Sequence, residues 1–157
     1  MKNDGFSLIE VMVAIVIAGV ALMGTLGAVE VSSRHVQQGG LNSKAIELAQ
    51  ARLEAKRSVR WQSLLEDDLD HDGTPETLMA DDGQGPDLTA GDGIYTAMYE
   101  RDGVTVVWMI ETERPGPPRS SAMVMIRAVA SYSGLNGHRR EVQVATIRSN
   151  PNFVGQR

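Results

Sequence analysis

The chain has 157 residues, a formal net charge of -5 and no cysteine, so it cannot form a disulfide. It has three histidines and no recognisable pairing of a nucleophile with a base, and the sequence therefore gives no support to an enzyme. Its charges are unevenly distributed. Residues 66–92 hold ten of the twenty acidic residues and neither Lys nor Arg, whereas residues 114–157 hold seven Arg and a single acid, Glu141. Such asymmetry favours a local binding site over a general charge effect.

The first predicted element is a membrane-spanning helix. Residues 11–29 carry no charge, and at about 1.5 Å of rise per residue they make a helix of about 28 Å, close to the hydrocarbon thickness of a bilayer. A secretory signal peptide would have a basic start, a shorter apolar core and a cleavage site of small residues after that core. This segment is therefore expected to remain in the mature chain. Glu10 stands at its start, where a carboxylate is costly and usually has a partner.

These residues carry a resemblance to a known family. The stretch KNDG followed by FSLIEVMVAIVIAGVALMG resembles the N-terminus of type IV pilin-like proteins, the class III signal of pilins, minor pilins and type II secretion pseudopilins. The resemblance implies that a prepilin peptidase cuts after Gly5, so that residues 1–5 are a leader, and methylates Phe6. It also implies that Glu10 pairs with the methylated N-terminus of a neighbouring subunit when the helices pass from the inner membrane into a filament. A buried charge is tolerable when an opposite charge meets it. The alternative is an ordinary signal anchor with a chance glutamate.

A long helix is expected to continue beyond the apolar run. Residues 6–30 are its transmembrane and filament-core half, and residues 31–62 are an amphipathic half. In the second half Lys44, Glu47, Glu54 and Lys56 are expected on faces other than the apolar one. That apolar face is predicted to consist of Leu41, Ala45, Ile46, Leu48, Ala49 and Leu53.

Two further features of this helix bear on its continuity and on the class of subunit. The pair Gly39-Gly40 is a point at which it can be interrupted, because each Gly costs about 1 kcal/mol against Ala. The string AIELAQARLEAKR resembles the helix of PilV-type minor pilins and of the related pseudopilins. Major pilins often have a proline near Gly27, and its absence here points towards a minor subunit.

Residues 94–157 are predicted to form an antiparallel sheet of four strands, IYTAMYER, VTVVWMIETE, AMVMIRAVASYS and HRREVQVATIR. Asp102-Gly103 and Asn136-Gly137 are hairpin signals between successive strands. Alternate residues from Val124 to Ala130 share one face, which is expected to cover the amphipathic half of the helix. The predicted fold class is α+β of the pilin type, with a long N-terminal helix packed against a four-stranded antiparallel sheet.

An acidic segment, residues 63–93, lies between helix and sheet. Its run DLDHDG, residues 68–73, matches D-x-D-x-D-G, the opening of an EF-hand-type calcium loop. Position twelve of such a loop is Met79 here, so the usual bidentate glutamate is missing. Either Asp81 or Asp82 closes the site, or calcium binding is weak, or the run is a solvated acidic loop. The predicted Ca²⁺ ligands are the side chains of Asp68, Asp70, Asp72 and Glu76 with the carbonyl of Thr74.

The continuation DDGQGPDLTAGDGIYT resembles a phrase common in bacterial surface proteins. Asp82, Asp87 and Asp92 form a second cation group or serve as Asx-turn residues that arrange a tight loop among glycines, and both interpretations stay open. A calcium ion would hold this acidic loop against the sheet where relatives use a disulfide.

A small basic patch near the C-terminus raises the question of DNA. His138, Arg139, Arg140 and Arg148 are not interleaved with aromatic residues, which makes a solvated strand end the preferred interpretation and DNA an unlikely partner.

The expected function is that of a PilV-like minor pilin at or near the tip of a type IV pilus. Its partners would be other pilin subunits and the prepilin peptidase, first in the inner membrane as a single-pass protein and then at the cell surface. The alternatives are a minor pseudopilin of a type II secretion system and a membrane-anchored calcium-binding module that never enters a filament.

Overall fold

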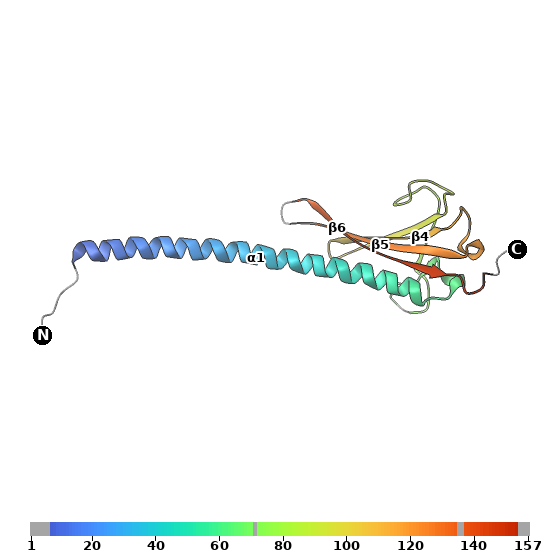
Figure 1. The fold of residues 1–157 in the computed structure, drawn as a ribbon, viewed down its shortest axis with the longest axis horizontal. Coiled ribbons are helices and arrows are strands. Elements are labelled where there is room, and N and C mark those ends of the chain that lie inside the picture. The colour runs from blue at the N-terminus through green and yellow to red at the C-terminus, as the bar shows by residue number, and fades with distance from the viewer. Residues whose placement is uncertain (1–6, 71, 135–136, 154–157) are drawn as a thin grey trace. The chain divides into compact units, whose positions relative to one another are not determined.

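The structure is a computed structural model that describes residues 7–70, 72–134 and 137–153. The chain divides into two units, residues up to Gly39 and residues from Gly40 onwards. A single helix, α1 (Leu8–Ser58), runs through the boundary (Figure 1). The predicted interruption at Gly39 and Gly40 is therefore wrong. Extending an existing helix adds one hydrogen bond for each residue fixed, and this gain outweighs the modest cost of two glycines between good helix formers.

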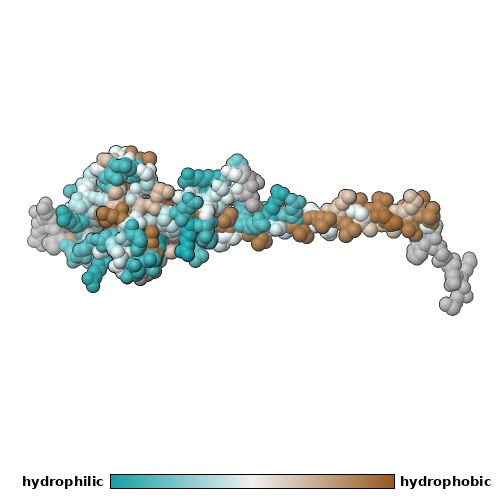
Figure 2. All heavy atoms as spheres, turned by 180° about the vertical axis from the view of Figure 1, so that it is seen from behind, coloured by the Kyte–Doolittle hydropathy of each residue, from teal (hydrophilic) through white to brown (hydrophobic). Residues whose placement is uncertain are grey.

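The first unit presents an apolar surface all round the helix. Its large apolar side chains, from Leu8 to Val36, are exposed by 47% or more. Figure 2 shows them as a run of hydrophobic residues along this part of α1. By length and composition the helix can cross a membrane. A helix that is apolar on every side requires a lipid or protein environment.

The second unit holds the α+β head, and the predicted fold class is confirmed. Strands β3 (Ile94–Arg101), β4 (Val104–Thr112), β5 (Met123–Ser133) and β6 (Arg139–Ser149) form one antiparallel sheet in that order. The segment predicted as an acidic loop contains a second, two-stranded antiparallel sheet of β1 (Glu66–Asp67) and β2 (Thr77–Leu78). Two short 3₁₀ turns, Trp61–Ser63 and Pro118–Ser120, complete the elements.

Turn chemistry fixes the register of the sheet. The predicted hairpin at Asp102-Gly103 is confirmed, because Arg101 faces Val104 across it and both turn residues have positive φ, 52° and 76°. This is the backbone geometry that a two-residue loop between twisted strands requires. Of the second predicted hairpin signal, Asn136 lies outside the described residues. Gly137 has φ of 72° and donates its N–H to the carbonyl of Gly134.

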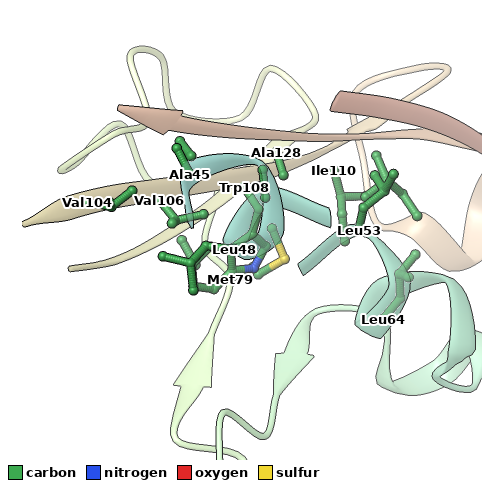
Figure 3. Close-up of a cluster of buried hydrophobic side chains, with 14 of the residues drawn as sticks. Ala45, Leu48, Leu53, Leu64, Met79, Val104, Val106, Trp108, Ile110 and Ala128 are labelled. Atoms are coloured by element: carbon green, nitrogen blue, oxygen red, sulfur yellow. The ribbon is translucent and has the colours of Figure 1, made fainter. Parts of the chain in front are cut away.

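The core forms where the second part of α1 meets one face of the sheet (Figure 3). Ala45, Leu48, Ala49 and Leu53 are buried on the helix, as the apolar spacing predicts. Trp108 is wholly buried opposite them, and the strand residues of the same face alternate with half-buried ones along β4 and β5. The buried strand residues are Val104, Val106, Ile110, Val124, Ile126, Ala128 and Ala130. Burying large side chains of this kind contributes about 1.5–3 kcal/mol each.

One charged residue departs from the predicted helix faces. Lys56 was expected away from the apolar side of α1, yet its side chain is only 1% exposed. The reason lies outside the helix, because Asp67 in β1 brings a carboxylate to within 2.7 Å of the Lys56 ammonium. A buried lysine is tolerable when it is paired and hydrogen-bonded in this way.

Candidate functional site

The first acidic group gathers the side chains that the D-x-D-x-D-G pattern predicts. Carboxylate oxygens of Asp68, Asp70, Asp72 and Glu76 all lie within 4.8 Å of one another. Gly73, with φ of 93°, supplies the sharp turn. Four carboxylates this close repel one another, and oxygen ligands of this kind suit a hard cation such as Ca²⁺.

Backbone N–H groups already orient these carboxylates. Gly73 donates to Asp68 Oδ2 at 2.8 Å, and Thr74 donates to Asp72 Oδ1 at 2.7 Å, which places Thr74 beside the group. Glu76 Oε2 accepts from the N–H of Leu69. Met79, at position twelve, is 2% exposed and belongs to the core, so the chain leaves the loop at that point without a carboxylate ligand.

The second acidic group differs from the predicted one in a single member. Asp81, Asp87 and Asp92 lie within 4.8 Å of one another. Asp82 stands outside this group and accepts a hydrogen bond from the N–H of Gln84 at 2.9 Å. Asp81 was considered in the sequence only as a residue that closes the first group. Its place beside Asp92 follows from the loop folding back on itself, which local spacing does not reveal.

The Asp81 side chain organises that loop by accepting hydrogen bonds from the loop backbone. Its two carboxylate oxygens accept from the N–H groups of Gly91, Asp92 and Gly93 at 2.6, 3.2 and 2.9 Å. Asp87, only 4% exposed, accepts from Gly83 at 2.7 Å. That hydrogen bond is the main reason why the pKa of Asp87 lies below its ordinary value. The Asx-turn interpretation is met by other bonds, in which Asp82, Asp87 and Asp92 each accept from the N–H group two residues further along the chain. The carboxylates of Asp81, Asp87 and Asp92 nevertheless lie side by side.

The predicted basic patch does not assemble around Arg148. This guanidinium donates to the carbonyl oxygens of Lys56 and Val59 at 2.7 and 2.5 Å and lies over the ring of Trp61. It therefore caps the C-terminus of α1, where a cation interacts favourably with the helix dipole.

The N-terminal end of α1 holds the remaining predicted residues. Gly5 and Phe6 lie outside the described residues. Ser7 caps the helix, because its Oγ accepts from the N–H of Glu10 at 3.3 Å. Ser7 and Glu10 thus stand in the S-x-x-E order of a capping box, a local signal that the sequence interpretation missed.

The carboxylate of Glu10 has an exposed position on the helix. Across the described part of the chain, no Lys, Arg or His side chain lies within ion-pair distance of it. In an apolar environment an ionised carboxylate without a partner is costly. The described residues therefore supply no counter-charge to Glu10.

The N-terminal part of the chain matches a known family motif. The family described as "Prokaryotic N-terminal methylation motif" matches residues 1–26. No match was found among curated proteins or among solved structures. The matched segment contains Gly5, Phe6 and Glu10 together with most of the apolar run.

This motif supports a pilin- or pseudopilin-type function in a pilus or a secretion system. It implies processing by a prepilin peptidase and assembly with other pilin-type subunits, and it suggests a structural subunit. The apolar first unit fits anchoring in the inner membrane before assembly.

Proposed function

We propose that this chain is a minor pilin of the PilV type, built into a type IV pilus at or near its tip. The observation that carries the proposal is the methylation motif over residues 1–26 followed by an apolar helix exposed on all sides. The resemblance of residues 45–57 to PilV-type helices favours the minor subunit. A minor pseudopilin of a type II secretion system is the second candidate, because it would share the same motif and helix.

The mechanism of assembly follows from the N-terminal residues. Cleavage after Gly5 creates a new cationic N-terminus at Phe6, two residues before Leu8, where α1 begins. When helices leave the bilayer for a filament, each apolar surface is transferred from lipid to neighbouring helices. Glu10 then supplies the negative charge that compensates the N-terminus of a neighbouring subunit, which satisfies two otherwise costly groups at once.

The decisive measurement is intact-mass analysis of the protein in filaments sheared from cells and in the membrane fraction. A pilus subunit will appear in the filaments without residues 1–5 and with one methyl group on Phe6. A processed species found only in the membrane fraction would favour the minor pseudopilin instead. An uncleaved chain would contradict both and favour the membrane-anchored module that enters no filament.

We also propose that the first acidic group binds Ca²⁺. The proximity of four carboxylates from Asp68 to Glu76 on a glycine turn carries this proposal. Because the glutamate of position twelve is absent, we expect a dissociation constant of roughly 10⁻⁴ to 10⁻³ M, as in extracellular modules. The ion would stabilise the acidic loop against self-repulsion.

Thermal unfolding of chelator-treated protein tests the calcium proposal. Ca²⁺ at 100 times its dissociation constant should add about 2.7 kcal/mol to the free energy of unfolding, and Mg²⁺ should add much less. Asp70→Asn should abolish the increase. Asp82→Asn is the matched control, since Asp82 belongs to neither group of close carboxylates, and should retain it. An identical melting temperature with and without Ca²⁺ would contradict calcium binding and favour a solvated acidic loop.

A further inference from the structure

The outer edge of β6 is an open hydrogen-bonding edge. In the β5–β6 ladder, Gly134 N–H bonds to the His138 carbonyl and Asn150 N–H bonds to the Ala122 carbonyl. These two bonds flank an unbroken register of eleven pairs, so the even-numbered residues of β6 bond to β5. The odd-numbered residues, from Arg139 to Ser149, therefore point their N–H and C=O groups away from the sheet. Among the described residues none bonds to these groups.

The opposite edge of the sheet is partly covered. Thr96 of β3 exchanges two backbone hydrogen bonds with Ala80, at 2.9 and 3.2 Å. By the same alternation, Met98 and Glu100 also point their backbone groups outwards, and in the described chain nothing bonds to them. The sheet thus has one edge open throughout, on β6, and one edge open only at the end that is nearest to the Asp102-Gly103 turn.

The middle of the β6 edge lacks the usual protection of edge strands. Val142 to Ile147, VQVATI, contains no charge, no proline and no glycine, and Ile147 is 69% exposed. Natural proteins blunt such edges with charges, prolines or bulges, because a bare edge is a template for another strand. An edge of this kind is explained when a strand from another molecule covers it.

Two identical β6 edges do not suit each other in an anchored protein. Tyr132, which faces Arg140, donates its hydroxyl to Asn42 Oδ1. Arg148 donates to the backbone carbonyl of Lys56. Helix residues 42–56 therefore run in the same direction as β6. Antiparallel pairing of two β6 strands would reverse helix residues 42–56 of one copy relative to those of the other.

Pairing of β6 with the β3 edge of a second copy keeps helix residues 42–56 of the two copies parallel. An antiparallel sheet of four strands has edge strands of opposite direction, so a second copy placed beside the first in the same orientation presents β3 antiparallel to β6. The outward-pointing residues are odd in β6 and even in β3, and in both strands their side chains lie on the face away from α1. The faces that pack against α1 consequently lie on the same side of the combined sheet in both copies. Such a contact is heterologous, because a different edge of each copy takes part in it.

Charge selects the register of this contact. Direct alignment of two sheets would place Glu100 opposite Glu141 and Arg101 opposite Arg140, because cross-strand partners put these residues at equal heights. Like charges directly opposite are destabilising. A slip of two residues, about 7 Å along the strand, places Glu100 opposite Arg139 and Met98 opposite Glu141.

We propose that the β6 edge of this chain receives the free end of β3, Met98 to Arg101, from a second copy of the chain in the same orientation, with Glu100 opposite Arg139. This inference rests on the proposed pilin-type function for the common orientation of the copies. Arg139 already pairs with Glu141 of its own strand at 3.1 Å, an exposed contact that is worth little and is easily exchanged.

Cross-linking of the full, processed chain in detergent micelles tests the contact. The chain has no cysteine, so introduced thiols react without background. Differently tagged copies with Met98→Cys and with Glu141→Cys are mixed and treated with a short bismaleimide. We expect at least fivefold more mixed dimer than from Met123→Cys with Glu141→Cys. Met123 is a matched control, since it is 47% exposed against 48% for Met98 but lies on β5.

Charge reversal gives a second, independent measurement. In the cross-linking pair, Glu100→Arg on the Met98→Cys copy or Arg139→Glu on the Glu141→Cys copy should each lower the yield severalfold, and the two together should restore it. Equal yields from Met98→Cys and Met123→Cys would overturn the proposed contact, as would a double reversal that fails to recover. Intact mass of the same samples reports leader removal and methylation separately. Failure of the edge contact can therefore be distinguished from failure of the pilin proposal.

Discussion

Lys56 and Asp67 form an ion pair inside the head. The distance from Nζ to Oδ2 is 2.7 Å, and the two side chains are 1% and 3% exposed. The Lys56 ammonium also donates to the carbonyls of Leu64 and Glu66, while Trp108 Nε1 donates to the same Asp67 oxygen at 2.7 Å. Burial lowers the pKa of Lys56, and the neighbouring carboxylate opposes that shift. This network joins the end of α1, β1 and the central strand β4.

Replacing Lys56 by Met should destabilise the head strongly. The change leaves the Asp67 carboxylate buried without its counter-ion, which typically costs about 3–5 kcal/mol. Urea unfolding of the Gly40–Arg157 unit measures the loss. In Lys56→Met with Asp67→Asn the side-chain carbonyl still accepts from Trp108 while the charge is gone, so most of the loss should be recovered. A single variant that loses less than about 1 kcal/mol would contradict the role of the pair.

Gly93 and Gly91 give a matched pair of substitutions. Both have positive φ, 88° and 78°, and an alanine is strained at either position by about 1–2 kcal/mol. At Gly93 the added Cβ would also lie 2.5 Å from Thr112 Oγ1, whereas nothing lies within 4 Å at Gly91. We expect Gly93→Ala to lose clearly more stability in urea unfolding than Gly91→Ala. Equal losses would mean that the loop moves away from Thr112 without cost.

The contact between Lys44 and Asp102 predicts a dependence on pH. The hydrogen bond from Lys44, at 2.5 Å, and its charge lower the pKa of the Asp102 carboxyl. Stability from this pair is fully present above about pH 4, the range of an unfolded Asp, and is lost as pH falls through the lowered pKa. Asp102→Asn tolerates the positive φ of the turn and removes the charge.

Melting temperatures across pH check this expectation. The wild-type protein should melt slightly above Asp102→Asn at pH 7, and the difference should disappear once the pH falls through the lowered pKa of the Asp102 carboxyl. Lys44→Gln should behave like Asp102→Asn at pH 7, and combining the two should add nothing. A difference that persists unchanged at low pH would assign the effect to the turn itself and not to the ion pair.

Substitution of Glu10 by Gln tests its charge while keeping the S-x-x-E/Q order of the N-terminal cap. Gln suits the third position of a capping box as well as Glu does, so Glu10→Gln should insert and be cleaved normally. Without the negative charge it should be depleted from filaments at least tenfold, which quantitative mass spectrometry of sheared filaments can measure. Glu30→Gln is the control, because Glu30 pairs with Arg34 one turn further along the same helix. Normal incorporation of Glu10→Gln would show that the charge is dispensable.

Periodicity and turn chemistry predicted most of the fold. The alternation of Val124, Ile126 and Ala128 and the helical spacing of Ala45, Ala49 and Leu53 specify which faces are buried. These signals are local and strong, since each depends only on residues within one element. The continuity of α1 through Gly39-Gly40 was misjudged, because propensity is a weak prior when the helix is already formed on both sides.

The missed features depend on residues that are distant in the chain. Lys56 lies seven residues after Ala49 and three after Leu53, so helical spacing places it on the buried face, but a charge there is explained only by Asp67, which reaches it from β1. Asp81 joins the second acidic group only because residues 91–93 fold back onto it. Helical spacing and turn motifs do not encode such pairings. The first acidic group was predictable for the opposite reason, since its members follow one another along a single turn.

The described core draws on no residue before Leu41. The folding energy of the head is therefore independent of the surroundings of the apolar helix. The head of a pilin-type subunit can therefore fold completely while its apolar helix lies in lipid. Exchange of lipid for protein neighbours around that helix then requires no refolding of the head. The free energy of extraction from the membrane then depends on the apolar helix alone. A mutation that destabilises the head should lower the amount of folded subunit without changing how strongly each subunit is anchored in lipid.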